Sequence, residues 1–299
     1  MAEITASLVK QLREKTGAGM MECKSALVEA NGNLEEAEVV LRKRGLASAA
    51  KKSARSAKQG LIGVHITADG KTGVLVEVNC ESDFVARTDE FQQMVAAMAA
   101  LVADKKPADQ AALLATPTAE GPSVEEMLKG KIAKIGENMV IPRFALHQAQ
   151  GVLGSYVHPG AQLAVLVDVT SSDAAAVAKP EFNELLHDLA MQVAAADPKF
   201  VNKEQVTAEY LEKEKEIQRA RALAEGKPEK IVDKVVEGRM AKYYEEVCLL
   251  EQPFIKENSH TISQVLAEKG KALGATFGVA GYVRFKVGET GGGEEAAAS

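Results

Sequence analysis

The first 45 residues place apolar side chains at helical spacing. One face of a helix predicted over residues 3–14 carries the apolar side chains Ile4, Leu8, Val9 and Leu12. A second helix is predicted over 22–30, and a third begins after the capping residue Asn33. Glycine commonly follows the last turn of a helix, so Gly45 is expected to end the third one. Residues 46–59 are then predicted to form a linker.

From Gly60 the pattern changes to the period of strands. Two apolar runs flank Asp69-Gly70, which is typical of a β-hairpin. The elements expected after this hairpin are a helix over 89–102, a polar loop over 104–122, a helix over 123–135 and a strand over 139–149.

The chain then repeats itself. Residues 60–103 align without a gap with residues 151–194, at an offset of 91, and identical residues fall at both strand and helix positions. Each copy is predicted to form a three-stranded antiparallel sheet with helices on one side, and the last strand of the second copy is expected over 278–288. The sequence therefore predicts an α+β fold with a duplicated core.

A charged, Ala- and Leu-rich segment interrupts the second copy. Gly226-Lys227-Pro228 divides it into helical stretches over 206–225 and 229–247, which are predicted to pair as an antiparallel coiled-coil hairpin. The apolar side chains expected to face one another are Val206, Tyr210, Ile217 and Ala220 on the first arm, and Ile231, Val235, Met240 and Tyr244 on the second.

Composition and charge narrow the function classes. The net charge of −6 and an aromatic content of 4% argue against a nucleic-acid-binding protein, although residues 1–59 alone are basic. No apolar run reaches membrane-spanning length and the first residues do not resemble a signal peptide, so we expect a cytoplasmic protein. Three scattered cysteines and five histidines show no disulfide or metal spacing. No catalytic motif is present, and we expect neither an enzyme nor a bound cofactor.

The two copies differ most sharply after their second strand. The first copy has Asp83-Phe84 where the second has Ala174-Ala175. Two interpretations are open: Phe84 packs back onto its own helix, or it protrudes as an aromatic anchor for a partner. The adjacent pair Met20-Met21 leaves a similar choice between the core of the first module and an exposed interface.

Four segments together resemble the bacterial elongation factor Ts family: TGAGMMECKSAL (16–27), VNCESDFVA (78–86), KIGENM (134–139) and EGKPEKIVDKVVEGRM (225–240). The resemblance extends from residue 1 to about 288. It implies a three-helix ubiquitin-associated-like module, a core of two related subdomains and a protruding helical hairpin. It also implies a guanine-nucleotide exchange factor for the GTPase elongation factor Tu.

The resemblance assigns residues to the GTPase contact. In the family an Asp-Phe pair wedges in near the magnesium and phosphate site of the partner, and dislocates the magnesium ion. The matching residues here are Asp83 and Phe84, flanked by Ser82, which replaces the usual Thr, and by Val85. The other contacts implied are Leu12, Arg13, Met20, Met21, Ile135, Gly136 and His158.

The resulting domain prediction has five parts: an N-terminal module (1–54), core subdomain N (55–149), core subdomain C (150–200 and 249–288), the inserted hairpin (201–248) and a flexible tail (289–299). The family often has a C-terminal helical module after the last strand, where only a Gly-rich tail is expected from this sequence. The expected partner is elongation factor Tu, in a heterodimer or a 2:2 heterotetramer, with no membrane and no direct nucleic-acid contact. The alternatives are a binding scaffold without exchange activity and a nucleic-acid binder.

Overall fold

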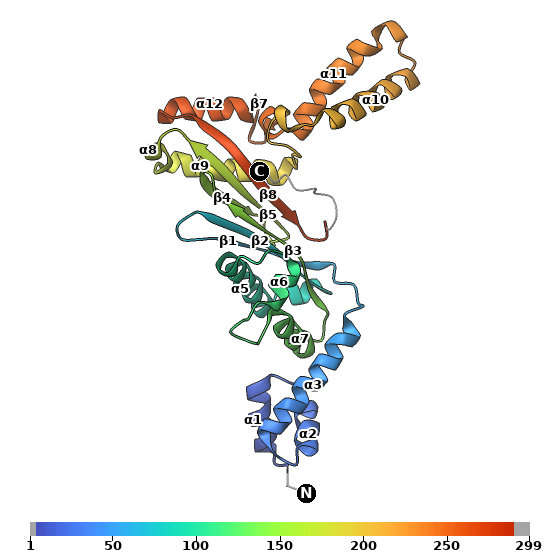
Figure 1. Cartoon of the computed structure of the whole chain (residues 1–299), viewed down its shortest axis with the longest axis vertical. Helices are drawn as coiled ribbons and strands as arrows, with labels where there is room; N and C mark the ends of the chain where they lie inside the picture. The colour runs from blue at the N-terminus through green and yellow to red at the C-terminus, as the bar shows by residue number, and fades with distance from the viewer. Residues whose placement is uncertain (1–3, 290–299) are drawn as a thin grey trace. The chain divides into compact units, whose positions relative to one another are not determined.

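The computed structural model describes residues 4–289, in which helices and small sheets form an α+β fold (Figure 1). Two compact units divide the chain. Unit 1 comprises Met1–Gly63 and Val76–Phe144, and unit 2 comprises Val64–Leu75 and Ala145–Ser299. Among the described residues no helix combines the length and the apolar character needed to cross a membrane. The predicted tail lies outside the described residues, apart from Glu289.

Unit 1 begins with three helices, α1 (Ala6–Thr16), α2 (Met20–Glu29) and α3 (Leu34–Lys52). Side chains of Thr5 and Asn33 accept hydrogen bonds from the first backbone N–H groups of α1 and α3, which fixes both starts. The three helices enclose a small core made of Val9, Leu12, Cys23, Ala26, Leu27, Ala30 and Ala37. The first three predicted helices are thus present.

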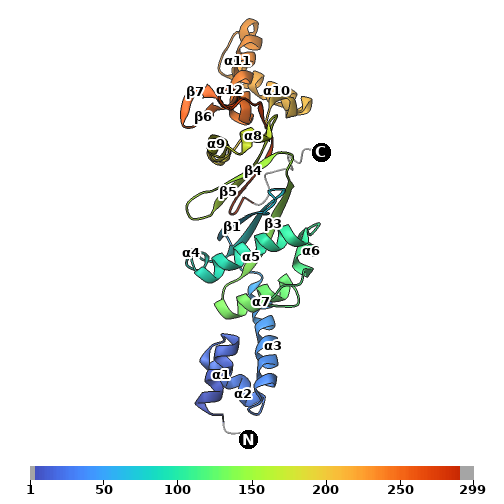
Figure 2. The ribbon, with the colours of Figure 1, turned by 90° about the vertical axis from the view of Figure 1, so that its left-hand side faces the viewer.

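Helix α3 does not end at Gly45, and this part of the sequence prediction was wrong. The helix continues through the expected linker to Lys52 (Figure 2). A side-chain carbon placed on Gly45 would lie only 3.0 Å from Cβ of Ala133 in α7 (Val124–Ile135). Glycine is therefore explained here by a close helix crossing, not by a helix end, and the Ala-rich sequence beyond it has high helix propensity.

The first three-stranded sheet has the order β1 (Gln59–Ile66), β2 (Thr72–Cys80), β3 (Met139–Gln148). Its helices are α4 (Asp83–Ala86), α5 (Asp89–Lys105), α6 (Gln110–Ala115) and α7. The loop predicted over 104–122 therefore contains a helix. Leu113 of α6 is fully buried, and Asp109 caps the helix, so one apolar side chain and one cap suffice to form this short element.

The second sheet has the order β4 (Val152–Val157), β5 (Leu163–Ser171), β8 (Phe277–Lys286), and both pairings are antiparallel. Val152 lies opposite Val169, and Leu166 lies opposite Val283. Helix α8 (Ala174–Val177) follows β5, and α9 (Pro180–Ala196) packs against the sheet through a shared apolar core.

The repeat in the sequence is a repeat in the structure. The bounds of β2, α4 and α5 differ from those of β5, α8 and α9 by 91 residues at both ends. Glycine also recurs where each helix approaches its sheet. A side-chain carbon on Gly63 would lie 2.8 Å from the carbonyl oxygen of Val95, and one on Gly154 would lie 2.9 Å from Cβ of Leu186. The same close approach is thus built twice.

Each copy also buries one carboxylate at equivalent positions of β2 and β5. Glu77 accepts a hydrogen bond from Nε of Arg143 at 2.7 Å, and Asp168 lies 2.9 Å from Nε2 of His147. A buried charge requires such partners. Asp168 also accepts hydrogen bonds from two backbone N–H groups, those of Gln150 (2.7 Å) and Gly151 (2.9 Å).

The segment inserted after α9 contains α10 (Ala208–Ala224) and α11 (Glu229–Val247), flanked by the 3₁₀ turns η1 (Lys203–Gln205) and η2 (Leu249–Glu251). The strands β6 (Pro253–Phe254) and β7 (Glu257–Thr261) and the helix α12 (Ile262–Leu273) follow. These three elements were not predicted from the sequence. Phe254, Ile262 and Leu266 bury their side chains in the core of the second copy.

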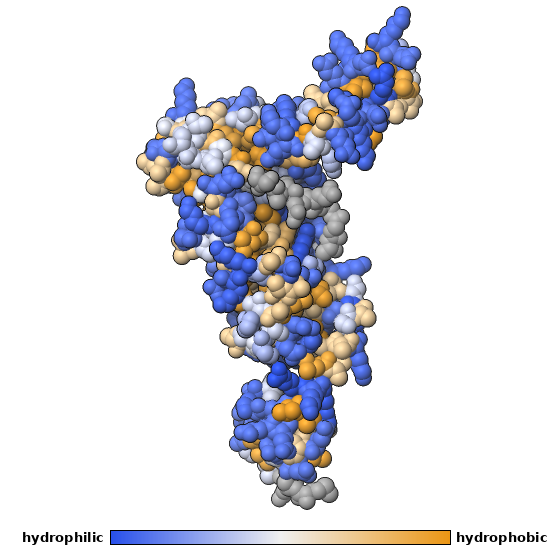
Figure 3. Space-filling view, in the orientation of Figure 1, coloured by the Kyte–Doolittle hydropathy of each residue, from blue (hydrophilic) through white to orange (hydrophobic). Residues whose placement is uncertain are grey.

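Helices α10 and α11 pack against each other, and the predicted facing residues were correct only in part: Met240 lies in the cluster between the helices and Val235 lies at its edge, as expected. The cluster between them consists of Ala222, Val232, Val236 and Met240, with Leu211, Val235 and Tyr243 at its edge. Tyr210, Ile217 and Ile231, which were expected inside, are about half exposed. Figure 3 accordingly shows scattered hydrophobic residues on a largely hydrophilic hairpin surface.

Candidate functional site

The candidate site is built on the turn that follows β2. Ser82 ends this turn, and its hydroxyl accepts a hydrogen bond from the backbone N–H of Val85 at 3.3 Å. This cap starts the four-residue helix α4, which lies at the edge of unit 1 (Figure 2). Phe84 is the second residue of α4, and 81% of it is exposed. The interpretation in which Phe84 packs back onto its own helix is therefore wrong.

The neighbours of Phe84 hold the short helix in place. Ala86 is buried, and Val85 is half-buried. Asp83 forms an ion pair with Arg87 at 2.9 Å, in which both side chains remain in contact with water. Such an exposed pair contributes little to stability, so the carboxylate of Asp83 stays available to a partner.

The segment between α7 and β3 binds the turn at residues 81–82 through Glu137. The carboxylate of Glu137 accepts three hydrogen bonds from the turn: from the backbone N–H of Glu81 (3.1 Å), the backbone N–H of Ser82 (2.9 Å) and the hydroxyl of Ser82 (2.5 Å). Hydrogen bonds to an ionised acceptor are stronger than neutral ones. Glu137 therefore ties the turn to the segment between α7 and β3.

Glu81, in the turn, also binds the segment that carries Glu137. Its carboxylate accepts a hydrogen bond from the backbone N–H of Asn138 at 2.6 Å, and it lies 3.6 Å from Nη1 of Arg55. The side-chain amide of buried Asn138 donates to the carbonyl oxygen of Arg55 at 2.7 Å. Three segments far apart in the sequence are thus linked at this point.

Cys80 lies beneath the turn. It is fully buried, and its thiol donates a hydrogen bond to the carbonyl oxygen of Ser82 at 3.1 Å. Burial, together with the negative charge of Glu137, raises the pKa of the Cys80 thiol to about 12. The thiol is therefore protonated at neutral pH and is chemically inert in the folded protein.

The equivalent turn in the second copy has the same backbone and a different surface. Asp173 caps α8 by accepting a hydrogen bond from the backbone N–H of Ala175 at 3.0 Å. Ser172 and Thr276 exchange two hydrogen bonds, at 2.8 and 3.0 Å, where the first copy has Glu81 and Asn138. The position of Glu137 is taken by Ala275. No aromatic side chain stands at the position of Phe84, and no carboxylate stands at the positions of Asp83 and Glu137.

The N-terminal module presents a second exposed surface. The turn before α2 leaves Met20 and Met21 52% and 73% exposed, and Arg13 is also exposed. Leu12 was expected to contact the GTPase as well, and the structure contradicts this. It is fully buried among the helices α1–α3, because its side chain is needed to fill their core. Leu12 therefore supports the module from inside and does not belong to its surface.

The remaining predicted residues fall in two places. Ile135 and Gly136 are half-buried at the end of α7, directly before Glu137, and Gly136 has a φ of 91° that favours glycine. The structure thus brings Gly136 close to the turn that carries Ser82. His158 belongs to unit 2, where it is exposed and its Nδ1 lies 3.0 Å from the hydroxyl of Tyr156.

The network formed by Glu137, Glu81, Asn138 and Arg55 was not predicted from the sequence. Glu137 and Asn138 lie within the segment KIGENM, which carried part of the family resemblance, but no spacing rule connects them with residues more than 50 positions away. Only the fold shows that these residues meet.

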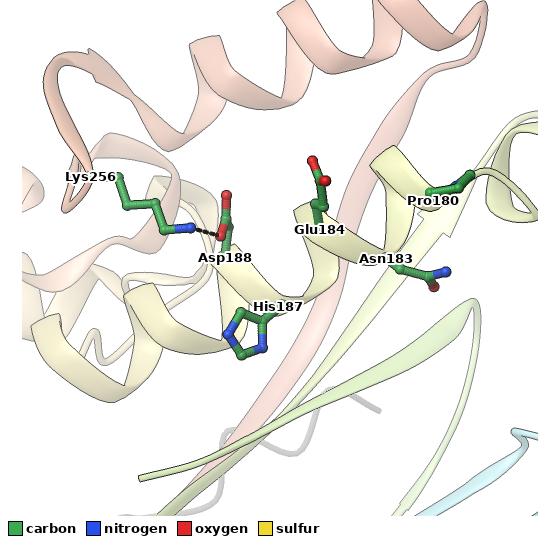
Figure 4. Close-up of a pocket in the computed structure, with 6 residues that line it drawn as sticks. All are labelled: Pro180, Asn183, Glu184, His187, Asp188 and Lys256. Carbon is green, nitrogen blue, oxygen red and sulfur yellow. Dashed lines mark hydrogen bonds and ion pairs between the residues drawn. The ribbon is translucent and has the colours of Figure 1, made fainter. Parts of the chain in front are cut away.

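A surface pocket lies on α9 (Figure 4). It is lined by Pro180, Asn183, Glu184, His187, Asp188 and Lys256. Asp188 and Lys256 pair with each other at 2.5 Å, so their charges are already compensated. Within residues 4–289 no group of three or more His, Cys, Asp or Glu side chains could hold a metal ion. This pocket offers no catalytic arrangement.

Comparison with known proteins gives a consistent result. The family model described as "Elongation factor TS" matches residues 81–289. Elongation factor Ts of Clostridium botulinum (strain Alaska E43 / Type E3) is 46% identical over 287 residues, which cover 96% of this chain and 93% of the relative. Elongation factor Ts of Solibacter usitatus is 47% identical over 292 residues, covering 98% and 95%. That of Nautilia profundicola is 45% identical over 292 residues, covering 97% and 94%.

Proposed function

The chain belongs to the elongation factor Ts family, and on that basis we propose that it is the guanine-nucleotide exchange factor of elongation factor Tu. In this proposal it binds the GDP-bound GTPase, inserts Asp83 and Phe84 near the magnesium and phosphate site, and promotes release of GDP and reloading with GTP. It acts by binding and not by chemical catalysis.

The exposure of Phe84 is the observation that carries this proposal. A phenylalanine left in water gains no stabilisation from its apolar surface, and the same fold without it exists in the second copy. Exposed aromatic side chains on a fixed backbone act as anchors in protein interfaces. An acidic neighbour, Asp83, adds a charge that repels phosphate and competes for a cation.

The physical mechanism follows from how a GTPase holds GDP. Backbone N–H groups and a magnesium ion bind the phosphates, so a side chain that displaces the metal weakens nucleotide binding. Thermodynamic linkage makes the effect reciprocal. If the exchange factor lowers the affinity of the GTPase for nucleotide, the nucleotide lowers the affinity of the GTPase for the exchange factor by the same ratio. The factor is thus released when GTP rebinds.

One side chain is not sufficient for fast exchange. Accelerating release about 10⁴-fold requires about 5.5 kcal/mol, since each tenfold costs about 1.36 kcal/mol. A single aromatic anchor contributes about 2–4 kcal/mol. Further contacts must supply the rest, and we assign them to Arg13, Met20, Met21, Val85, Ile135, Gly136 and His158.

The finer architecture belongs to the same proposal. Residues 1–54 are assigned as a ubiquitin-associated-like module, 55–149 as core subdomain N, 150–200 with 249–288 as core subdomain C, and 201–248 as a coiled-coil hairpin. The 1:1 or 2:2 stoichiometry with the GTPase stays a prediction.

The test is stopped-flow release of fluorescent GDP from elongation factor Tu of the same organism, with and without this protein. The expected result is an exponential release whose rate rises with the concentration of this protein and then saturates. Binding with an unchanged release rate would contradict the proposal and leave a passive scaffold. Binding that weakens steeply with salt and requires RNA would instead favour the nucleic-acid alternative.

A further inference from the structure

The turn that carries Phe84 is held by the carboxylate of Glu137, which lies in the segment between α7 and β3. Glu137 uses both of its oxygens on this turn: Oε2 accepts from the N–H groups of Glu81 and Ser82, and Oε1 accepts from the Ser82 hydroxyl. Ser82 is also the cap of α4. The orientation of the cap is therefore set by Glu137.

Helix α4 depends on this support. It has four residues, and isolated helices of that length are unstable in water because nucleation is unfavourable. Phe84 is 81% exposed, so its own side chain contributes little packing that could fix the direction in which it points. The direction of Phe84 must come from the cap and from the residues that hold the cap.

The second copy is an internal control for this argument. In its turn Ser172 and Thr276 exchange two hydrogen bonds, and the Ser171 hydroxyl bonds to the backbone of Asp173. Ala275 stands in place of Glu137, and α8 still forms. The carboxylate is thus not needed to build the fold. It occurs in the copy whose helix presents an aromatic side chain, where precision of the helix matters.

We propose that Glu137 is a positioning residue for exchange: its three hydrogen bonds hold the turn 81–82 so that Phe84 is presented in one orientation before the GTPase is met. This inference rests on the proposed exchange function. The benefit is preorganisation, since a fixed anchor loses less conformational entropy on binding than a mobile one.

Two variants separate geometry from charge. Glu137→Ala leaves the N–H groups of Glu81 and Ser82 without their acceptor. Glu137→Gln removes the negative charge but keeps an oxygen for the two N–H groups and an amide that can donate to the Ser82 hydroxyl. We expect Glu137→Ala to loosen the turn and Glu137→Gln to retain it.

Cys80 supplies a local readout that does not depend on exchange activity. Its buried thiol lies under the turn and bonds to Ser82, so it reacts with iodoacetamide only when the turn opens. We expect Glu137→Ala to speed alkylation of Cys80 about tenfold or more relative to Glu137→Gln, while buried Cys23 and Cys248 react as in the wild type. Comparison with Glu137→Gln removes the effect of the lost charge on the Cys80 thiol.

Exchange kinetics supply the functional readout. Because misplacement of a functional group by about 1 Å can cost up to about 10²-fold in rate, we expect Glu137→Ala to lower the maximal GDP-release rate about tenfold. The concentration for half-maximal release should change less. In a Phe84→Ala background, Glu137→Ala should cause no further loss, because there is then no aromatic side chain to position.

Ser172→Ala is a control in the second copy: it removes the hydrogen bond to Thr276 that corresponds to the contact between Glu81 and Asn138, in a turn without an aromatic side chain. It should leave exchange unchanged. The inference is overturned if Cys80 reacts equally in Glu137→Ala and Glu137→Gln. It is also overturned if the rate losses of Glu137→Ala and Phe84→Ala multiply, or if Glu137→Gln loses as much exchange as Glu137→Ala. A wild-type protein that fails to release GDP contradicts the proposed function instead, and the Cys80 measurement then still decides whether Glu137 holds the turn.

Discussion

The turns after β2 and β5 have the same backbone and present different chemistry to solvent. Both lead into a helix of four residues, and both are followed by a helix of 17 residues at the same offset. The first presents Asp83 and Phe84, and the second presents two alanines. The shared features are those that the fold requires. The features found in one copy only are those that need another explanation.

This comparison separates two kinds of phenylalanine in the same copy. Phe91 and its counterpart Phe182 are fully buried and recur in both copies, as expected of core residues. Phe84 is exposed and does not recur. A duplicated chain therefore distinguishes side chains that the core requires from side chains that it does not, without any comparison between species.

The largest expected effect is a loss of stability on removing the phenylalanine that both copies share in their cores. Phe91→Ala and Phe182→Ala should each lower the free energy of unfolding by about 3–5 kcal/mol, because each leaves a cavity in a close-packed core. Urea unfolding curves measure both variants. Similar losses would support two equivalent cores. A loss below about 1 kcal/mol in either variant would show that the copies are not equivalent.

The second largest expected effect concerns Phe84, which only the first copy has. Phe84→Ala should slow GDP release more than tenfold, a change of more than about 1.4 kcal/mol. Its free energy of unfolding should stay within about 0.5 kcal/mol of the wild type, because the side chain is exposed. GDP release and urea unfolding are measured on the same preparations.

The reciprocal substitution is the control. Ala175→Phe places the aromatic side chain on the equivalent, exposed position of α8. It should leave exchange unchanged. Normal exchange by Phe84→Ala would sink the assignment of Phe84, whatever the effect of Ala175→Phe.

The smallest expected effect is a pH-dependent change in stability through Asp168, the buried carboxylate of the second copy. Burial raises the pKa of Asp168, but hydrogen bonds from His147 and from the backbone N–H groups of Gln150 and Gly151 outweigh it and hold the pKa below its ordinary value. The carboxylate therefore stabilises the fold at neutral pH, and this contribution is lost as the pH falls through the lowered pKa of the folded state.

Asp168→Asn should accordingly be less stable than the wild type at neutral pH. The difference should narrow as the pH is lowered below about 3.9, the ordinary pKa of an aspartate. Urea unfolding across this range measures it. A difference that stays constant with pH would show that the charge of Asp168 does not stabilise the second copy.

The repeat and most elements could be predicted from the sequence, because strand and helix periods are local properties. Asn33 and Thr5 act as caps through neighbours two or three residues away, and such signals are visible in the chain. The turn after β2 was also located, since the two copies differ there. Its exposure was not decided, because burial of Phe84 depends on what the fold places around it.

The predictions that failed depend on contacts between residues far apart in the sequence. Gly45 was taken as a helix end because its neighbour Ala133 is 88 positions away in the sequence. In the hairpin, Ile217 and Ala222 both fit an apolar stripe, and only the packing of α10 on α11 selects Ala222. The contact between Glu137 and Ser82 is likewise non-local. Local patterns specify the elements, whereas the pairing of their faces is a property of the whole chain.

The continuation of α3 through Gly45 has a consequence for how two surfaces work together. The helix has 19 residues, which corresponds to a rod of about 28 Å at about 1.5 Å per residue. It joins the surface around Met20 and Met21 to the part of unit 1 that carries Phe84. Once one surface is engaged, the other is held at a high effective concentration, and a stiff spacer confines it to a narrow range of positions. If both surfaces bind the GTPase as proposed, they act as one bivalent ligand, so that neither needs to bind tightly alone.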